Sequence, residues 1–406
     1  MSWSLAPAGI SVSVFEREQS ASEYRPREWT MGIHWALPIL ESLLPDDLRD
    51  RWKEAYVDPT VDFSDPKCKS MQMYNGVTGE LMKEIVVPGT MVRVSRRRLR
   101  AFLSQQIDVQ YDHTLTDIEY TSSGVTAVFA NGTTASGSLI IGADGPKSAV
   151  RSLLLGPDSD AVPLEQIIHA NTAYSPGTAE RALFLRALHP VWAMVMSPGM
   201  FSFYSIQDTH SSADPSSWVF QVACGWLGSK DASQTPADRV KEIKERAQNL
   251  PEPFRSAIMW IPDDQDLTYD TISYWASKPW DTRGGRVTLA GDAAHPMPPH
   301  RGQGLNHAIQ DAFNLVKLLG RVAGGEAELG EIQECSEEVA KRGAEEVEVS
   351  KQNAFMTLDW ERLKESPVFK QALNPIHEVK VDGKKQDAEA EVEKAEKEEV
   401  APMGGA

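Results

Sequence analysis

The first clearly patterned segment of the chain is ISVSVFE, residues 10–16, in which apolar and polar positions alternate before a final Glu16. This period of two predicts a β-strand. A strand that ends in an acidic residue is typical of the second strand of a dinucleotide-binding βαβ unit, where the carboxylate binds a ribose hydroxyl. Such a unit begins with a strand and a glycine-rich turn, yet Gly9 is the only glycine before Gly32. The pattern predicts either a nucleotide-binding unit that lacks its first strand and phosphate loop, or a segment that only resembles one.

The next segments show helical spacing and a hairpin. Apolar positions three or four residues apart predict a helix within residues 29–45, in which Pro38 marks a kink or the first turn. MQMYNGVTGELMKEIVV, residues 71–87, predicts a β-hairpin whose turn is NGVTG. RVSRRRLRAFLSQQI, residues 93–107, contains a helix for which Ser95 is a suitable N-cap.

The middle of the chain is rich in β-like runs. Short strands alternate with turns over residues 109–142, including the hairpin signal ANGT. Four further runs are predicted as strands: RALFLRAL (181–188), VWAMVM (191–196), FSFYSI (201–206) and WVFQVACGWL (218–227). One helix is predicted among them, PADRVKEIKERAQNL (236–250). Together these segments predict a separate antiparallel sheet with a helix against it, followed by helices over residues 304–373.

Composition restricts the class of protein. The 406 residues are 41% hydrophobic and 24% charged, which is ordinary for a soluble globular protein. The net charge of −17 argues against nucleic acids and anionic membrane surfaces as partners. Residues 374–406 are rich in lysine and glutamate and predict a disordered acidic tail. Three unpaired cysteines, the absence of a signal peptide and the absence of a membrane-length apolar run predict a cytoplasmic protein without a metal site.

Two segments carry candidate chemistry. In LIIGADGPKSAVRSLL, residues 139–154, an apolar strand runs into small residues that let a backbone approach a ligand closely. Asp144 lies in this turn and is suited to accept hydrogen bonds from hydroxyls or from loop amides. A tight turn without a ligand explains this segment equally well.

The second segment is RVTLAGDAAHPMPPHRGQGLNHAIQDAFNLVKLLG, residues 286–320. Its strand leads to Asp292, where a ribityl or ribose hydroxyl would need an acceptor. Three prolines stiffen the following loop, and two glycines at its end permit close backbone approach. The amphipathic helix that follows has its N-terminus at Gly302 to Asn306, where free amides and the helix dipole favour an anion or an electron-rich carbonyl.

With VFERE, REWTMGIHWALP and RVSRRRLRAFL in the same order, these two motifs resemble the FAD-dependent aromatic-hydroxylase superfamily, the single-component flavin monooxygenases. The resemblance covers roughly residues 8–370 and is greatest to fungal members. It implies an α/β fold: a doubly wound FAD-binding domain interleaved with an antiparallel β-sheet substrate domain, and a helical C-terminal part. The implied FAD-binding segments are residues 1–60, 93–158 and 284–373. The implied substrate-domain segments are the hairpin of residues 61–92 and the sheet of residues 159–283.

The resemblance also implies roles for individual residues. Glu16 would bind the adenosine ribose, and the backbone near Met31 and Gly32 would line the flavin. Arg96 would reach the FAD phosphate or ribityl region. Asp144 would support FAD and the docking region of the nicotinamide. The remaining implied cofactor-binding residues belong to the second motif: Gly291, Asp292, Pro299, Gly302, Gly304, Leu305 and Asn306. Within it, Asp292 would bind the ribityl chain or pyrophosphate, and the amides of residues 304–306 would face the flavin pyrimidine edge.

The implied activity is that of a monooxygenase. FAD, NAD(P)H as co-substrate and O2 would hydroxylate or epoxidise a small aromatic or polycyclic molecule through a flavin C4a-hydroperoxide. Tyr204 and Arg186, on predicted strands, are the candidates for substrate contact, although both are explained more simply as sheet residues. His295 and His300 are interpreted as loop-packing or hydrogen-bonding groups. Two alternatives stay open: a non-catalytic homologue that binds FAD weakly or not at all and acts as a binding or scaffold protein, and an FAD-dependent dehydrogenase or halogenase of the same fold. Nothing in the sequence indicates an oligomeric state.

Overall fold

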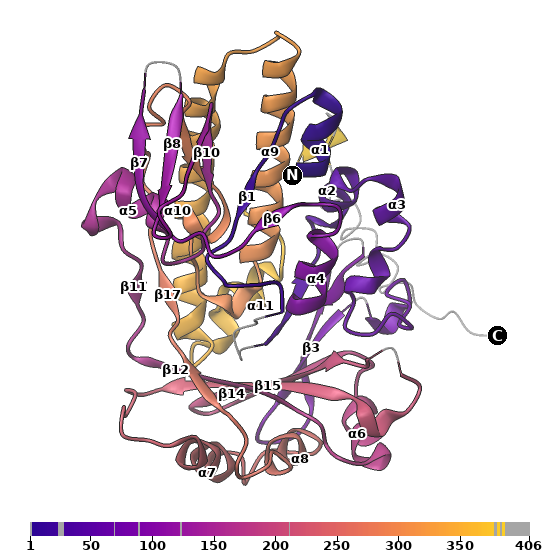
Figure 1. Ribbon diagram of the computed structural model, residues 1–406. Helices are drawn as coiled ribbons and strands as arrows, with labels where there is room; N and C mark the ends of the chain where they lie inside the picture. Colours follow the sequence, from indigo (N-terminus) through magenta and orange to yellow (C-terminus); the bar gives the residue numbers. More distant parts are fainter. Residues whose placement is uncertain are drawn as a thin grey trace, which may run out of the picture.

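The structure is a computed structural model and has two parts (Figure 1). It describes residues 2–22, 28–68, 70–87, 90–121, 124–210, 212–376, 380–381 and 384–385. One part contains the long helices α9 and α10 and several short strands, and the other is a large sheet with three helices beneath it (Figure 1). Most of the predicted tail, residues 374–406, lies outside the described residues.

The large sheet has seven strands in the order β16-β12-β15-β14-β13-β3-β4. Its strands are β3 (Ser70–Asn75), β4 (Leu81–Val86), β12 (Ile167–Tyr174), β13 (Trp192–Ser197), β14 (Met200–Asp208), β15 (Val219–Leu227) and β16 (Thr268–Asp270). All neighbours pair antiparallel except β13 and β3, which are parallel. The helices below it are α6 (Ala179–Arg186), α7 (Pro236–Arg246) and α8 (Phe254–Met259) (Figure 1). The predicted hairpin, antiparallel sheet and helix are confirmed.

Strand β14 explains how this sheet joins the two parts. Every residue from Met200 to Gln207 is buried, although successive side chains of a strand point to opposite faces. The strand is therefore covered on both faces, by helices below and by the helix-rich part above, which is why its sequence reads as a nearly continuous apolar run.

The helix-rich part contains small sheets. Two parallel pairs are β1 (Val14–Phe15) with β6 (Val109–Gln110), and β10 (Ile140–Gly142) with β18 (Val287–Leu289). Within the described ranges no strand joins these pairs into one sheet. The antiparallel elements are β2 (Thr30–Ile33) with β5 (Val92–Ser95), β11 (Val162–Pro163) with β17 (Ser273–Tyr274), β19 (Lys380–Val381) with β20 (Lys384–Lys385), and the meander β7 (Leu115–Tyr120), β8 (Val125–Phe129) and β9 (Thr134–Gly137).

Two long helices dominate this part, α9 (Gly304–Ala323) and α10 (Ile332–Met356), and they lie side by side (Figure 1). The shorter helices are α1 (Ser2–Leu5), α2 (Leu37–Leu43), α3 (Asp46–Arg49), α4 (Arg96–Leu103), α5 (Ala149–Leu155) and α11 (Pro367–Gln371). No helix among the residues that the structure describes has the length and apolar character needed to cross a membrane. The three cysteines carry free thiols.

One predicted element was right only in part and another was wrong. The helix predicted within residues 29–45 is confirmed at Leu37–Leu43 with Pro38 in its first turn, but residues 30–33 before it form strand β2, which pairs with β5. The run RALFLRAL, residues 181–188, is not a strand but helix α6 and the residues that follow it. Thr178 caps this helix by accepting a hydrogen bond from the Arg181 amide, and only one side of the helix is buried.

Two other predictions were confirmed with shorter bounds. The strand predicted over residues 10–16 is ordered as a strand only at Val14–Phe15. Helix α4 begins at Arg96, directly after β5, and Ser95 is its N-cap as predicted, with the Arg98 amide donating to the Ser95 hydroxyl at 3.5 Å.

Candidate functional site

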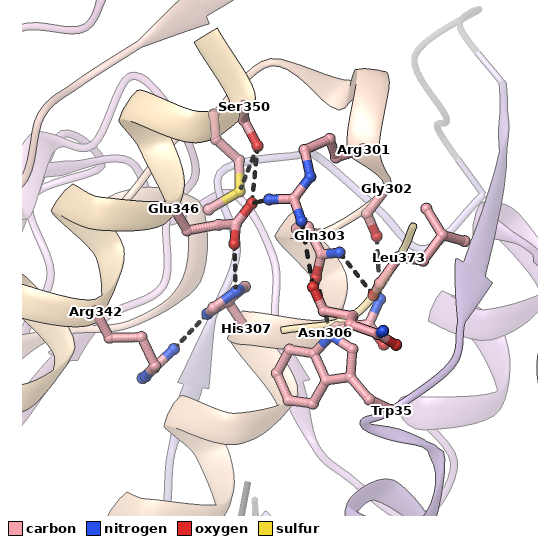
Figure 2. A network of polar contacts seen from close by, with 12 residues as sticks. Trp35, Arg301, Gly302, Gln303, Asn306, His307, Arg342, Glu346, Ser350 and Leu373 are labelled. Atoms are coloured by element: carbon pink, nitrogen blue, oxygen red, sulfur yellow. Dashed lines mark hydrogen bonds and ion pairs between the residues drawn. The ribbon is translucent and has the colours of Figure 1, made fainter. Parts of the chain in front are cut away.

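The motif of residues 286–320 forms a strand, a loop and a helix. After β18, Gly291 and Gly302 adopt positive φ values of 60° and 62°, a conformation that favours glycine. Helix α9 starts at Gly304, and the side chain of its N-cap residue Gln303 does not cap the first turn. The side chain of Gln303 instead connects two other segments: its Oε1 accepts from Trp35 Nε1 at 2.9 Å, and its Nε2 donates to the Leu373 carbonyl at 3.0 Å (Figure 2). Among the described residues the first amides of α9 are therefore left without a side-chain acceptor.

Asp292 lies beside this helix N-terminus. Its Oδ1 is 3.7 Å from the position that a Cβ atom on Gly304 would occupy, so the sequence-predicted residues Asp292 and Gly304 are brought together. The side chain of Asp292 is exposed at the surface of the loop. The surrounding protein nevertheless restricts its hydration and raises its pKa, and His295 and Arg151 partly oppose this effect.

Asn306 connects the helix N-terminus to the predicted flavin-side strand β2. Its Nδ2 donates to the carbonyls of Gly32 and Gly302, each at 3.1 Å, and its Oδ1 accepts from the His34 amide at 3.0 Å. The side chain is completely buried. The structure therefore brings together three residues that sequence reasoning assigned to the flavin site but could not connect.

Met31, Leu305 and Pro299 complete the sequence-predicted set around the loop. Met31 and Leu305 are half-buried, on β2 and in the first turn of α9, and Pro299 is exposed in the 3-10 turn Pro299–Arg301.

The end of the loop is bound to helix α10 by buried charges. Arg301 forms an ion pair with Glu346, and both side chains are fully buried (Figure 2). A second Arg301 nitrogen donates to the Asn374 carbonyl at 3.2 Å, and the Ser350 hydroxyl donates to Glu346 at 3.1 Å. These contacts fix the position of the segment directly before α9.

The start of the loop is bound by a second buried cluster. Asp311 accepts from the Gly291 amide and contacts His295 Nε2, both at 2.7 Å, and accepts from Arg342 at 2.6 Å. Burial alone would raise the pKa of Asp311, but His295 and Arg342 outweigh it and lower that pKa. Arg342 also contacts His307 at 2.7 Å, and desolvation lowers the pKa of His307 to about 4.

The GADG turn is held by its own helix and by an arginine that sequence reasoning missed. Asp144 caps α5: it accepts from the Ser148 hydroxyl and, at 2.7 Å and 3.2 Å, from the amides of residues 149 and 150. Arg151 is fully buried and donates to the carbonyls of Pro146 at 2.6 Å and Ala293 at 2.8 Å. Arg151 therefore joins the two motifs, and its only sequence signal is its place at the end of GADGPKSAVR.

Two further predicted residues lie in other elements. Glu16 follows β1, where its Oε1 accepts from the Glu18 amide at 3.0 Å, and Arg100 lies 4.0 Å from its carboxylate. Arg96 is the first residue of α4, and its guanidinium lies 4.7 Å from the ring centroid of Trp29.

The face of the sheet toward the loop is aromatic. Phe201 on β14 contacts His300 of the loop, with ring centroids 5.4 Å apart, and His300 also lies 6.0 Å from His169 on β12. Both ring nitrogens of His300 are buried and have no hydrogen-bond partner among the described residues, and desolvation lowers its pKa to about 3. Phe203 lies on the same face as Phe201 because the two residues are two positions apart on one strand.

Tyr204 and Arg186 do not belong to this face. Tyr204 alternates with Phe203 and points to the helix side, where its hydroxyl donates to the Leu185 carbonyl at 2.9 Å. Arg186 is the last residue of α6, not a strand residue, and it donates to Asp58 at 2.9 Å. The side chains of both residues therefore donate hydrogen bonds to groups within the protein.

The comparisons with known proteins agree with this geometry. A family model described as "FAD binding domain" matches residues 92–350. The chain is 40% identical over 378 residues to FAD-dependent monooxygenase phnB of Penicillium herquei, covering 92% of this chain and 91% of that protein. It is 35% identical over 369 residues to FAD-dependent monooxygenase cctM of Talaromyces islandicus, covering 90% and 91%.

The fold is also found among solved structures. Klebsiella pneumoniae HpxO complexed with FAD and uric acid superimposes with a TM-score of 0.71 at 20% identity, covering 91% of this chain and 88% of that one. The chain therefore belongs to the FAD-dependent monooxygenases, a family of oxidoreductases. FAD is the cofactor of this family, and NAD(P)H is its typical co-substrate.

Proposed function

We propose that this monooxygenase uses NAD(P)H and O2 to hydroxylate or epoxidise a small aromatic or polycyclic molecule. The observation that carries the proposal is the position of the cofactor motif. The loop of residues 291–306 packs through His300 onto the aromatic face of the large sheet. A cofactor at the loop and a flat substrate on the sheet would therefore meet.

The residues at the loop fit the flavin end of FAD. The amides at the start of α9 have no side-chain cap, so they are free to donate to the pyrimidine edge. Asp292 is an open acceptor next to Gly304 and suits the ribityl hydroxyls. Gly32 and Gly302 present backbone without a side chain on either side of Asn306.

We assign three tasks to this chain's own residues. When bound, FAD supplies the redox chemistry that activates O2 with electrons from NAD(P)H. The dipole and amides of α9 would stabilise negative charge at the pyrimidine edge, because the donors already point outward before reaction. The buried charge clusters would hold those donors in place. The apolar sheet face would orient the substrate and exclude water from the reacting atoms.

The test is oxygen transfer by the purified full-length chain with added FAD. Under ¹⁸O2, a panel of phenols and polycyclic aromatics should accelerate NAD(P)H oxidation and yield a product containing one ¹⁸O atom. We expect Asp292→Asn to weaken FAD binding, whereas the matched control Asp281→Asn, at a carboxylate that is 64% exposed, should not. NAD(P)H oxidation without oxygenated product would contradict the proposal and favour a dehydrogenase. A folded chain that is colourless after incubation with excess FAD and removal of the unbound flavin would favour a non-catalytic homologue.

A further inference from the structure

Arg93 is a half-buried cation that has no role in the proposed function. It lies on β5, where its Nε donates to the Thr30 hydroxyl at 2.8 Å and its Nη2 to the Thr30 carbonyl at 3.3 Å. Its guanidinium carbon lies 5.2 Å from the ring centroid of Trp192 and 5.0 Å from that of Phe203. The guanidinium is therefore held over two aromatic rings of the large sheet.

The charge of Arg93 has no acidic partner within the part of the chain that the structure describes. Burial alone lowers its pKa, to about 9, and no carboxylate acts to raise it. Two buried arginines of the described residues pair with a carboxylate, Arg301 with Glu346 and Arg342 with Asp311. Arg151, also buried, instead donates to backbone carbonyls. A partly desolvated charge without an acidic partner is costly, so a cation in this position favours a ligand that supplies the negative charge.

The position of Arg93 places that ligand between the flavin side and the sheet. Its Nη1 lies 3.6 Å from the point that a Cβ atom on Gly32 would occupy, and Gly32 is the β2 residue bound by Asn306. Trp192 and Phe203 lie on the sheet face that also carries Phe201, beneath the loop. One nitrogen of the fork, Nη1, has no hydrogen-bond partner among the described residues, while the other two are held by Thr30.

We propose that Arg93 is a substrate-binding residue that recognises an anionic oxygen, phenolate or carboxylate, on an aromatic substrate lying against Trp192 and Phe203. The proposal rests on the proposed function and specifies its substrate class. Thr30 orients the guanidinium, Nη1 donates to the anionic oxygen, and the two rings hold the flat part of the molecule. An arginine suits this task because its fork is planar, always charged and able to stack on rings.

The experiment measures binding rather than turnover, so its outcome is separable from that of the proposed function. Isothermal titration calorimetry on the full chain with saturating FAD compares 2-naphthoate with neutral 2-naphthamide, and ionised 4-nitrophenol with neutral 4-nitroanisole. The two pairs distinguish a carboxylate from a phenolate. We expect the wild-type protein to bind one anion about 30-fold more tightly than its neutral partner, the factor that truncating one partner of a buried charge pair usually removes.

Variants at Arg93 test whether its guanidinium causes this preference for the anion. Arg93→Gln should abolish it and leave binding of the neutral ligand unchanged, whereas Arg93→Lys should retain part of it because the charge remains. The control Arg283→Gln, at a side chain that is 51% exposed, should bind like the wild type.

Three results would overturn the proposal. The wild-type protein could show no preference for either anion, Arg93→Gln could keep the preference, or Arg93→Gln could fold but fail to bind FAD, in which case Arg93 serves the cofactor. If the melting curve shows that Arg93→Gln does not fold, the proposal is tested by two remaining measurements. These are the anion preference of the wild-type protein and its partial retention in Arg93→Lys.

Discussion

Replacing Asn306 by alanine removes the side chain that connects β2 to the start of α9. Three backbone groups lose a hydrogen bond: the buried amide of His34 and the partly buried carbonyls of Gly32 and Gly302. The Gly302 carbonyl keeps a contact with His34 Nε2 at 3.3 Å. Alanine leaves the volume of the lost side-chain amide empty and supplies no donor or acceptor in its place. We therefore expect the flavin-side strand and the helix N-terminus to become uncoupled.

The magnitude follows from the number of unsatisfied groups. Each buried polar group without a partner costs about 1–3 kcal/mol. The two carbonyls are accessible enough to bind water, so the buried His34 amide accounts for most of the cost and the total is about 2 kcal/mol. For a large domain about 2 °C of melting temperature corresponds to 1 kcal/mol, so Asn306→Ala should melt about 4 °C lower than the wild type.

The assay is a thermal melt combined with an FAD titration, with Asn314→Ala as the control. Asn314 lies on the same helix, but its bonds to Gln310 and Glu338 are on the partly exposed side, so its loss should cost less than about 0.5 kcal/mol. Asn306→Ala should also weaken FAD binding, because Gly32 and Gly302 shift. Equal melting temperatures for the two variants would refute the energetic reasoning. A destabilised Asn306→Ala with unchanged FAD affinity would refute the role of this connection at the cofactor.

Two further predictions concern pH and packing. Desolvation lowers the pKa values of three buried histidines from 6.5 to about 4: His34, His189 and His307. As the pH falls, these histidines take up protons in the unfolded chain before they do so in the folded protein. The free energy of unfolding is therefore highest above about pH 6.5 and falls towards pH 4, by up to ~3 kcal/mol per histidine. Melting temperatures that stay constant between pH 7 and pH 4.5 would contradict this. Gly225→Ala would place a Cβ atom 2.2 Å from the Phe201 ring, and we expect a loss of about 1–3 kcal/mol and weaker binding of aromatic ligands. Gly228→Ala, with its nearest atom at 3.5 Å, is the control, and equal melting and ligand affinity in both variants would contradict the packing argument.

The sequence predicted the features that are local along the chain. Strand, loop and helix in residues 286–320 are contiguous, so glycine, proline and apolar spacing determine their geometry directly. The Ser95 cap was predictable for the same reason. Local spacing misled where a strand led straight into a helix, as at β2, because the apolar positions of the two elements happened to fall at helical intervals. It also misled at α6, where a half-exposed apolar helix carries a run that reads as a strand.

Contacts between distant segments were not predictable. Arg93 meets Trp192 only because β5 and β13 approach in the folded chain. The alternation of VRVS places Arg93 opposite two buried valines, but it does not show what lies on that side. The contacts of Arg151 were unpredictable for a related reason: its acceptors are backbone carbonyls of loops, which no residue type in the sequence identifies.

The buried charges behind the loop explain why its amides stay available to a ligand. Polar side chains at both ends of the loop are bound by other residues of the protein: His295 contacts Asp311, and Arg301 pairs with Glu346. Helix α10 can approach this closely because Gly343 has no side chain; a Cβ atom there would lie 2.7 Å from that of His295. Buried ion pairs contribute little net stability, so their benefit here is a fixed geometry. The charged groups of α9 and α10 hold both ends of the loop, and among the described residues no side chain caps the first amides of α9, so these donors stay available to a ligand.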